Sequence, residues 1–273
     1  MRYFKFSNIA LTLGILFLYL PLVVLVVFSF SGSPLISIWG GWSTIWYEVL
    51  FQDSDVIASV LLSLEIAVCA STGAVIIGTM AAYSLERIRK FRGKSIFYGM
   101  VVTPLVMPDV VVGISLLLMF ISLQSLISWP DGRGFITILI AHITFCSAYV
   151  TVVMQSRLAN IDTSIEEAAQ DLGAKPMKTF FYITLPQIIP AIVSSWLLSF
   201  TLSLDDLVIT EFVAGPSSTT LPMYIYSTVK TGPTPEINAV ATIIIGVVSI
   251  AVVLATLITF RLEKRKKRER MKK

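Results

Sequence analysis

Long apolar stretches separated by short charged segments make up most of this 273-residue chain. Each of six stretches is long enough to cross a hydrocarbon core of about 30 Å at about 1.5 Å per helical residue. They cover residues 9–30, 56–85, 95–126, 135–154, 187–210 and 238–260. The pattern predicts an all-α, polytopic membrane protein with six transmembrane helices. We expect the prolines within the stretches to kink the helices rather than end them. They are Pro21, Pro104, Pro108 and Pro190.

Composition supports a membrane protein independently of the pattern. Hydrophobic residues make up 55% of the chain, the mean hydropathy is +0.82, and only 14% of residues are charged. Soluble domains carry about 25% charged residues. At about 22 residues, the first apolar stretch is longer than the apolar region of a signal peptide and lacks a cleavage site of the A-x-A type. We therefore interpret it as a retained anchor.

Basic residues gather on one side of the predicted membrane. Nineteen of the 21 Lys and Arg residues fall there, and only Arg133 and Lys230 fall on the other side. The positive-inside rule therefore predicts that both termini are cytoplasmic. The pI of about 9.0 reflects these flanking residues and does not indicate nucleic-acid binding. The basic tail at residues 261–273 is interpreted as a solvated segment that contacts lipid headgroups.

The loop at residues 157–186, predicted to be cytoplasmic, has its own helix signals. Ser164 stands three residues before Glu167, and Thr163 three before Glu166, which predicts a capping box. Gly173 can end this helix in the left-handed conformation, and Pro176 can open a second short helix over residues 177–183. That helix is expected to expose three aromatic residues, which would suit a docking surface better than a connector on the bilayer. They are Phe180, Phe181 and Tyr182.

Four acidic residues lie inside the predicted spans. A charged side chain costs roughly 2.5 to 3.5 kcal/mol there, and no Lys or Arg occurs within the six spans to pair with it. Helix counting places Glu65 and Asp109 near the middle or outer half of the membrane and the Asp205-Asp206 pair near the outer face. Adjacent helical residues point about 100° apart, so one member of the pair at most is expected to face a pathway. Acids without internal bases favour a cationic cargo, although hydrogen bonding within the protein is an open alternative.

The first external loop, residues 31–55, contains three acids, no basic residue and several aromatic residues. Aromatic faces attract ammonium groups, so Trp46, beside Tyr47, is a candidate cation contact. Interfacial anchoring is the alternative role for these rings.

Other chemistry is not supported by the sequence. Gly93-Lys94-Ser95 lacks the first glycine of a phosphate-binding loop, so the chain is not expected to bind ATP, and no catalytic residue is assigned. Cys69 and Cys146 lie within spans and are expected to be small core residues rather than a disulfide or metal pair. His142, the only histidine, is expected to be packed or hydrogen-bonded rather than a metal ligand or proton relay.

The spacing Glu167-Ala168-Ala169-x3-Gly173-x9-Ile183-x-Leu185-Pro186 resembles the EAA motif of binding-protein-dependent ABC importer permeases. The resemblance implies a type I (MetI-like) permease fold, and a loop that seats in a cleft of a cytoplasmic ATPase subunit. ATP and Mg would be bound by that partner, and no cofactor by this chain. The implied coupling residues are Glu166, Glu167, Ala168, Ala169, Asp171, Gly173, Phe180, Leu185 and Pro186.

Further segments resemble one branch of these permeases. Residues 104–110, 164–174 and 200–209, with Gly41-Trp42-Ser43, are similar to bacterial spermidine and putrescine permeases, nearest the second permease subunit of the putrescine importer. This implies an inner-membrane subunit that works with a second permease subunit, two ATPase subunits and a periplasmic polyamine-binding protein. The candidate residues of the cargo pathway, chosen above from their charge or aromatic character, are Trp46, Glu65, Asp109, Asp205 and Asp206. A permease for ferric ion or thiamine, or a secondary transporter driven by an ion gradient, is the alternative.

The expected organisation has three parts. Residues 1–55 form the first helix and external loop, residues 56–260 form a five-helix permease core that includes the 157–186 loop, and residues 261–273 form the tail.

Overall fold

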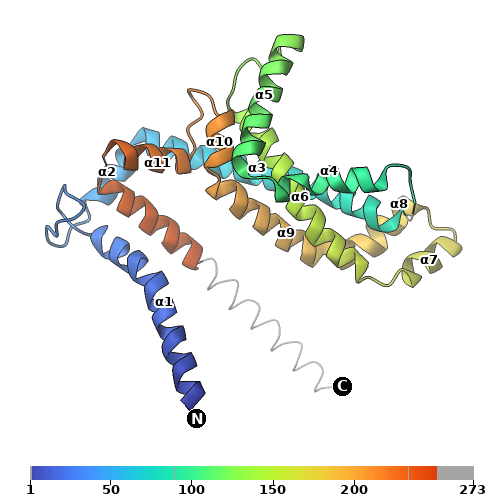
Figure 1. Cartoon of the computed structure of the whole chain (residues 1–273), viewed down its shortest axis with the longest axis horizontal. Coiled ribbons are helices and arrows are strands. Elements are labelled where there is room, and N and C mark those ends of the chain that lie inside the picture. Colours follow the sequence, from blue (N-terminus) through green and yellow to red (C-terminus); the bar gives the residue numbers. More distant parts are fainter. Residues whose placement is uncertain (1, 89, 233, 251–273) are drawn as a thin grey trace. The chain divides into compact units, whose positions relative to one another are not determined.

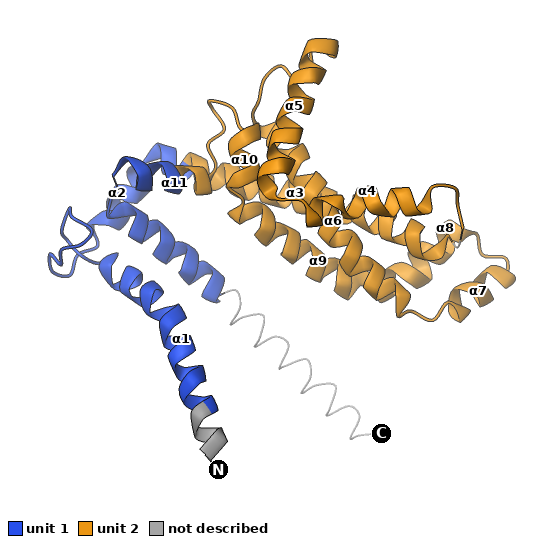
Figure 2. Ribbon diagram, viewed as in Figure 1, with its two compact units in different colours: residues 1–57, 225–273 blue, residues 58–224 orange. Residues whose placement is uncertain are grey.

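A computed structural model describes residues 2–88, 90–232 and 234–250, with side chains from residue 7 onward. Within these residues the secondary structure is helical, so the all-α prediction is confirmed. The chain divides into two compact units (Figure 2). The first comprises residues 1–57 and 225–273, and the second comprises residues 58–224. The tail at 261–273 lies outside the described residues.

Five described helices are long and apolar enough to span a membrane (Figure 1). The sixth predicted span starts within a helix at Glu236–Ile250, and residues 251–260 lie outside the described part. The five are Ser7–Phe28 within α1 (Arg2–Phe28), α3 (Ser54–Arg87), α5 (Asp109–Ile127), α6 (Phe135–Ala159) and the continuous helix Pro176–Asp205.

The first unit contains α1, the loop after it, and the short helix α2 (Ile45–Gln52). It also contains most of α11 (Leu221–Thr231) and the helix Glu236–Ile250. No residue of the α1 window that could span a membrane is buried within the described chain. A helix that is apolar on all sides and uncovered by its own chain is suited to contact lipid or another subunit.

Helix α6 lies at the centre of the core of the second unit. It packs against α9 (Leu185–Asp205), α4 (Lys94–Val106) and α10 (Val208–Val213). Helix α3 also approaches α6 closely, because a Cβ atom at Gly78 would lie only 2.7 Å from Cβ of Val150. Small residues allow such close backbone approach between membrane helices. The site described below is therefore held on a densely packed frame.

The third apolar stretch is not one kinked helix, so that prediction was wrong. Helix α4 ends at Val106, Met107 is extended with ψ of 141°, and α5 begins at Asp109. A residue before proline is disfavoured in helical conformation, and Pro108 provides no backbone N–H. Pro108 therefore ends a helix, whereas the other three prolines named above lie inside helices, as predicted.

The fifth stretch also differs from its predicted bounds of 187–210. Its helix already starts with α8 (Pro176–Thr179), continues through a π-helical turn at Phe180–Thr184, and runs on as α9. The predicted second short helix is therefore the beginning of a span rather than a separate element. Helix α9 ends at Asp205, Asp206 is extended with ψ of 124°, and α10 follows.

Candidate functional site

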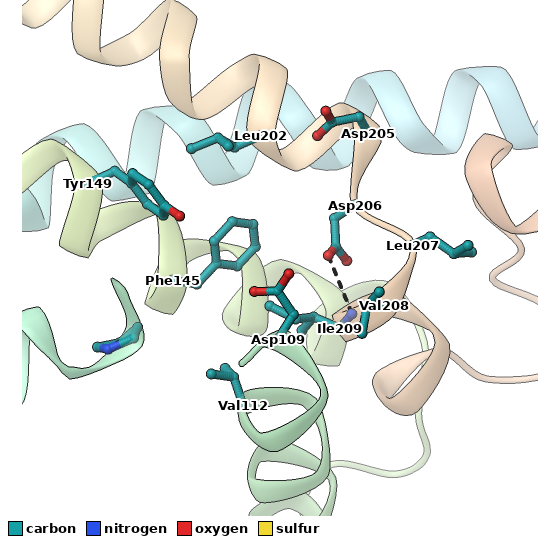
Figure 3. Close-up of a pocket in the computed structure, with 11 residues that line it drawn as sticks. Asp109, Val112, Phe145, Tyr149, Leu202, Asp205, Asp206, Leu207, Val208 and Ile209 are labelled. Carbon is teal, nitrogen blue, oxygen red and sulfur yellow. Dashed lines mark hydrogen bonds between the residues drawn. The ribbon is translucent and has the colours of Figure 1, made fainter. Parts of the chain in front are cut away.

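The two helix breaks meet at a cavity of about 330 Å³ within the second unit (Figure 3). Asp109 lines it from the start of α5, and Asp205 and Asp206 line it from the end of α9. Phe145 and Tyr149 contribute aromatic rings from α6. None of the described residues that line it is basic. Non-helical backbone at membrane depth is tolerated where it lines a cavity, and broken helices often form binding sites in transporters.

Both members of the Asp205-Asp206 pair reach the cavity, contrary to the expectation that one of them at most could. That expectation assumed a continuous helix, whereas α9 ends between the two residues. The shared cavity also places Asp109 at the same level of the unit as the pair, although helix counting assigned them to separate depths.

Asp109 and Asp205 present exposed side chains at the cavity. Within the described part of the chain, neither carboxylate has a hydrogen bond or ion pair with another residue's side chain or backbone. Asp109 is the first residue of the 19-residue helix α5. These two groups are thus available to an incoming cation.

Asp206, by contrast, is held by the protein. Its Oδ2 accepts hydrogen bonds from the Thr210 backbone N–H at 2.8 Å and the Thr210 hydroxyl at 2.7 Å, and its Oδ1 accepts one from the Ile209 N–H at 3.3 Å. His142 Nε2 lies 3.4 Å from Oδ2. Asp206 therefore caps the first turn of α10. Hydrogen bonding within the protein, the alternative left open for the acids in the spans, is therefore confirmed for Asp206.

The remaining two predicted cargo residues lie elsewhere. Glu65 is exposed on α3 and does not line this cavity. Trp46 belongs to the first unit, where its indole N–H donates to the Ser31 carbonyl at 2.8 Å. The Tyr47 hydroxyl lies 2.7 Å from the Ser29 hydroxyl. The hydrogen bonds of both aromatic residues therefore stabilise the loop that precedes them. The cation contact at Trp46 stays a prediction.

The 162–186 segment turns sharply at Gly173, as predicted. Helix α7 (Ser164–Asp171) is followed by Gly173 with φ of +88°. The Ala174 N–H donates to the Ala169 carbonyl at 3.0 Å, and the Gly173 N–H donates to the Gln170 carbonyl at 2.9 Å. This is the Schellman pattern, in which a left-handed glycine satisfies the last carbonyls of a helix.

The capping box predicted for α7 does not form. Thr163 occupies the N-cap position without a side-chain hydrogen bond to the helix. Instead, the Asp162 Oδ1 accepts a hydrogen bond from the Ser164 N–H at 2.9 Å. This bond holds the pKa of the Asp162 carboxyl below its usual value.

The outer side of the 162–186 segment is an exposed surface with a mixed character. Its exposed polar residues include Glu167 and Asp171. Ala168 and Pro186 are also exposed, whereas Ala169 and Leu185 are half-buried. Phe180 was predicted to be exposed, and this was wrong. It is half-buried because its ring packs edge-on against that of Tyr83, with 5.0 Å between the ring centroids. The exposed apolar residues are Ile165, Leu172, Met177, Phe181 and Tyr182. We call this set the apolar docking face.

Glu166 points inward, away from the apolar docking face. Its Oε2 lies 3.0 Å from Arg87 Nε, and its Oε1 accepts hydrogen bonds from Arg87 Nη2 at 3.1 Å and the Thr184 hydroxyl at 2.8 Å. Arg87 also donates to the Leu158 carbonyl at 3.2 Å. The buried ion pair thus ties α7 to the ends of α3 and α6 and to the beginning of the fifth span.

Substitutions of Glu166 and of its neighbour Glu167 should differ in their effect on the stability of the complex. Removal of one partner of a buried ion pair leaves an uncompensated charge and typically costs about 3 to 5 kcal/mol. We expect Glu166→Gln to lower the midpoint of thermal unfolding of the purified complex clearly, and Glu167→Gln to leave it nearly unchanged. Equal shifts for the two variants would contradict the assigned contacts.

Comparison with known proteins assigns the chain to a class. A model of the family described as "Binding-protein-dependent transport system inner membrane component" matches residues 74–268, and the chain belongs to this family. Among solved structures, a bacterial ABC transporter for import of the acidic polysaccharide alginate covers 94% of this chain and 95% of its own, with a TM-score of 0.69 at 18% identity. The MetNI methionine ABC transporter covers 73% and 92%, with a TM-score of 0.58 at 13% identity. These similarities show the MetI-like permease fold.

Closer relatives are found by sequence. The chain is 55% identical over 261 residues to the putrescine transport system permease protein PotI of Escherichia coli, covering 96% of this chain and 93% of PotI. It is 45% identical over 243 residues to the spermidine/putrescine transport system permease protein PotC of Haemophilus influenzae, covering 89% and 92%.

Several residues of the site were missed by sequence reasoning. Arg87 was counted only as a topology signal, and Thr184 was not considered. His142 was expected to be hydrogen-bonded, which is confirmed, but its place beside Asp206 was not foreseen. The available signal was that an ionisable residue inside a span marks a functional site by default.

Proposed function

We propose that this chain is a permease subunit of an ATP-driven importer that moves polyamines, putrescine or spermidine, from the periplasm to the cytoplasm. The observation that carries the proposal is the 55% identity to PotI across nearly the whole of both chains. The acids that line the cavity support it.

The cavity has the chemistry that a polyamine needs. Among the described residues, three carboxylates and no basic group line it, so an ammonium group is attracted there and an anion is repelled. Phe145 and Tyr149 add aromatic rings, whose faces also attract ammonium groups. Because Asp206 is already engaged, Asp109 and Asp205 are proposed as the direct cation contacts. Glu65 and Trp46, which do not line this cavity, are proposed as further residues of the cargo pathway.

The 162–186 segment is proposed to receive the motion of the ATPase. Both termini and this segment would face the cytoplasm, where the apolar docking face and Glu167 would seat in the ATPase cleft. Two ATPase subunits would bind ATP and Mg, while a second permease subunit and a periplasmic polyamine-binding protein complete the complex. ATP-driven closure of the ATPases would open the cavity toward the loaded binding protein, and hydrolysis would reset it inward.

Uptake by cells tests the choice of cargo. Cells that lack this gene should lose most uptake of labelled putrescine, and restoration of the gene should recover it. Excess unlabelled putrescine or spermidine should compete, whereas thiamine or ferric ion should not. Competition by thiamine or ferric ion, with none by the amines, would assign the permease to another cargo.

A further inference from the structure

His142 bridges the break at the end of α9. It lies on α6 and is only 1% exposed. Its Nδ1 lies 2.7 Å from the Ser203 hydroxyl on α9, and its Nε2 lies 2.9 Å from the Thr210 hydroxyl on α10. Asp206, the extended residue at the break, lies between these two helices in the chain. One imidazole therefore contacts both sides of the break.

The direction of the hydrogen bonds follows from the Thr210 hydroxyl. A hydroxyl has one proton to donate, and here it donates to the Asp206 Oδ2 at 2.7 Å. The bond between Thr210 and His142 Nε2 must then run from the imidazole N–H to the hydroxyl oxygen. The result is an ordered chain in which His142 donates to Thr210 and Thr210 donates to Asp206.

We propose that His142 and Thr210 are positioning residues for the acids of the cavity. They fix the Asp206 carboxylate, and with it the end of α9, so that Asp205 is presented to the cavity that Asp109 also lines. Neither His142 nor Thr210 lines the cavity, so both act through Asp206. The inference rests on the proposed function, because it assigns these residues to the same cation site.

The hydrogen-bond network around His142 is suited to fixing one geometry of the helix break, rather than only to holding the helices together. His142, Thr210 and Ser203 are buried, so each polar group costs free energy unless its partners are in place. A satisfied network of this kind has one low-energy arrangement, whereas apolar side chains of similar size can repack in several. The geometry of the break is thereby specified at the point where two acids meet the cavity.

Two substitutions at Thr210 test this role in the assembled complex reconstituted with its binding protein. Thr210→Val keeps the side-chain shape but removes the hydroxyl that links His142 to Asp206, whereas Thr210→Ser keeps the hydroxyl. We expect Thr210→Val to lower the putrescine transported per ATP hydrolysed about tenfold, the scale of one lost buried hydrogen bond. Thr210→Ser should remain within about twofold of the parent. Thr151→Val is the matched control, because Thr151 is a buried threonine of α6 that does not line the cavity.

A double variant separates positioning from general loss of stability. If Thr210 acts through Asp206, adding Thr210→Val to Asp206→Asn should cause little further loss, since residues that act as a unit are not additive. A parental transport ratio in Thr210→Val, or a loss that multiplies with that of Asp206→Asn, overturns the inference. If those results occur while Asp109→Asn still impairs uptake, the proposed function stands and only the positioning role fails. If the parent complex does not transport putrescine, both fail.

Discussion

Gly173→Val should abolish cargo-stimulated ATP hydrolysis while the complex still assembles. Gly173 has φ of +88°, and a Cβ atom there would meet no other atom within 4 Å. The cost of valine is therefore one of backbone conformation, more than about 1 kcal/mol for a β-branched residue in the left-handed region. The chain relieves this strain by changing the turn, which moves α7, with Ile165, relative to the part of the apolar docking face that follows the turn. The measurement is ATPase activity with and without the loaded binding protein.

A second glycine provides the control for this prediction. Gly93, which precedes α4, has φ of +86° and equally open surroundings, but it lies outside the 162–186 segment. Gly93→Val should impose similar strain without uncoupling ATP hydrolysis from cargo. Gly173→Asn should be nearly silent, because asparagine tolerates the left-handed conformation. Parental coupling in Gly173→Val would remove the segment from the coupling mechanism.

Asp109→Asn should lower polyamine uptake about tenfold, because a hydrogen bond to a charged group contributes about 1.5 kcal/mol or more. The substitution preserves size and removes the charge of an acid that has no partner among the described residues. Assembly and ATP hydrolysis should persist, since among the described residues Asp109 forms no hydrogen bond or ion pair with the 162–186 segment. Glu65→Gln is the comparison, because Glu65 is an acid of a span that does not line the cavity. Its effect on uptake should be smaller.

The ratio of spermidine to putrescine uptake sharpens this prediction. A longer cation carries more ammonium groups and can still reach the remaining acids, so Asp109→Asn should impair spermidine uptake less than putrescine uptake. A reduced rate with an unchanged ratio would make Asp109 a packing residue whose loss slows transport of every cargo. Equal uptake by the parent and the variant would exclude Asp109 from the pathway.

The sequence predicted those features that depend on local chemistry. The apolar stretches are helices, and Gly173 takes the left-handed conformation because only a residue without Cβ does so freely. Pro176 opens a helix because its missing N–H needs no partner at the first position. Membership of the permease family was predicted from the resemblance of residues 167–186 to the EAA motif, and the family match confirms it.

The features that the sequence did not predict depend on contacts between distant segments. At the break, the Asp206 carboxylate contacts Thr210 and His142, and the periodicity of the sequence does not predict these contacts. Glu166 satisfies the sequence pattern of a capping box, yet Arg87, 79 positions away, offers a stronger charged partner. The same contact turns Glu166 inward, whereas Glu167 is exposed. The sequence alone does not distinguish these two adjacent glutamates.

We propose that this chain forms part of the polyamine pathway of an ATP-driven importer. The most direct measurement is uptake of labelled putrescine by vesicles that contain the purified complex, with the loaded binding protein outside and ATP inside. We expect uptake that requires ATP, that unlabelled spermidine inhibits, and that falls sharply in the Asp109→Asn, Asp205→Asn double variant although ATP hydrolysis continues. ATP-independent uptake, or full uptake by the double variant, would contradict this proposal.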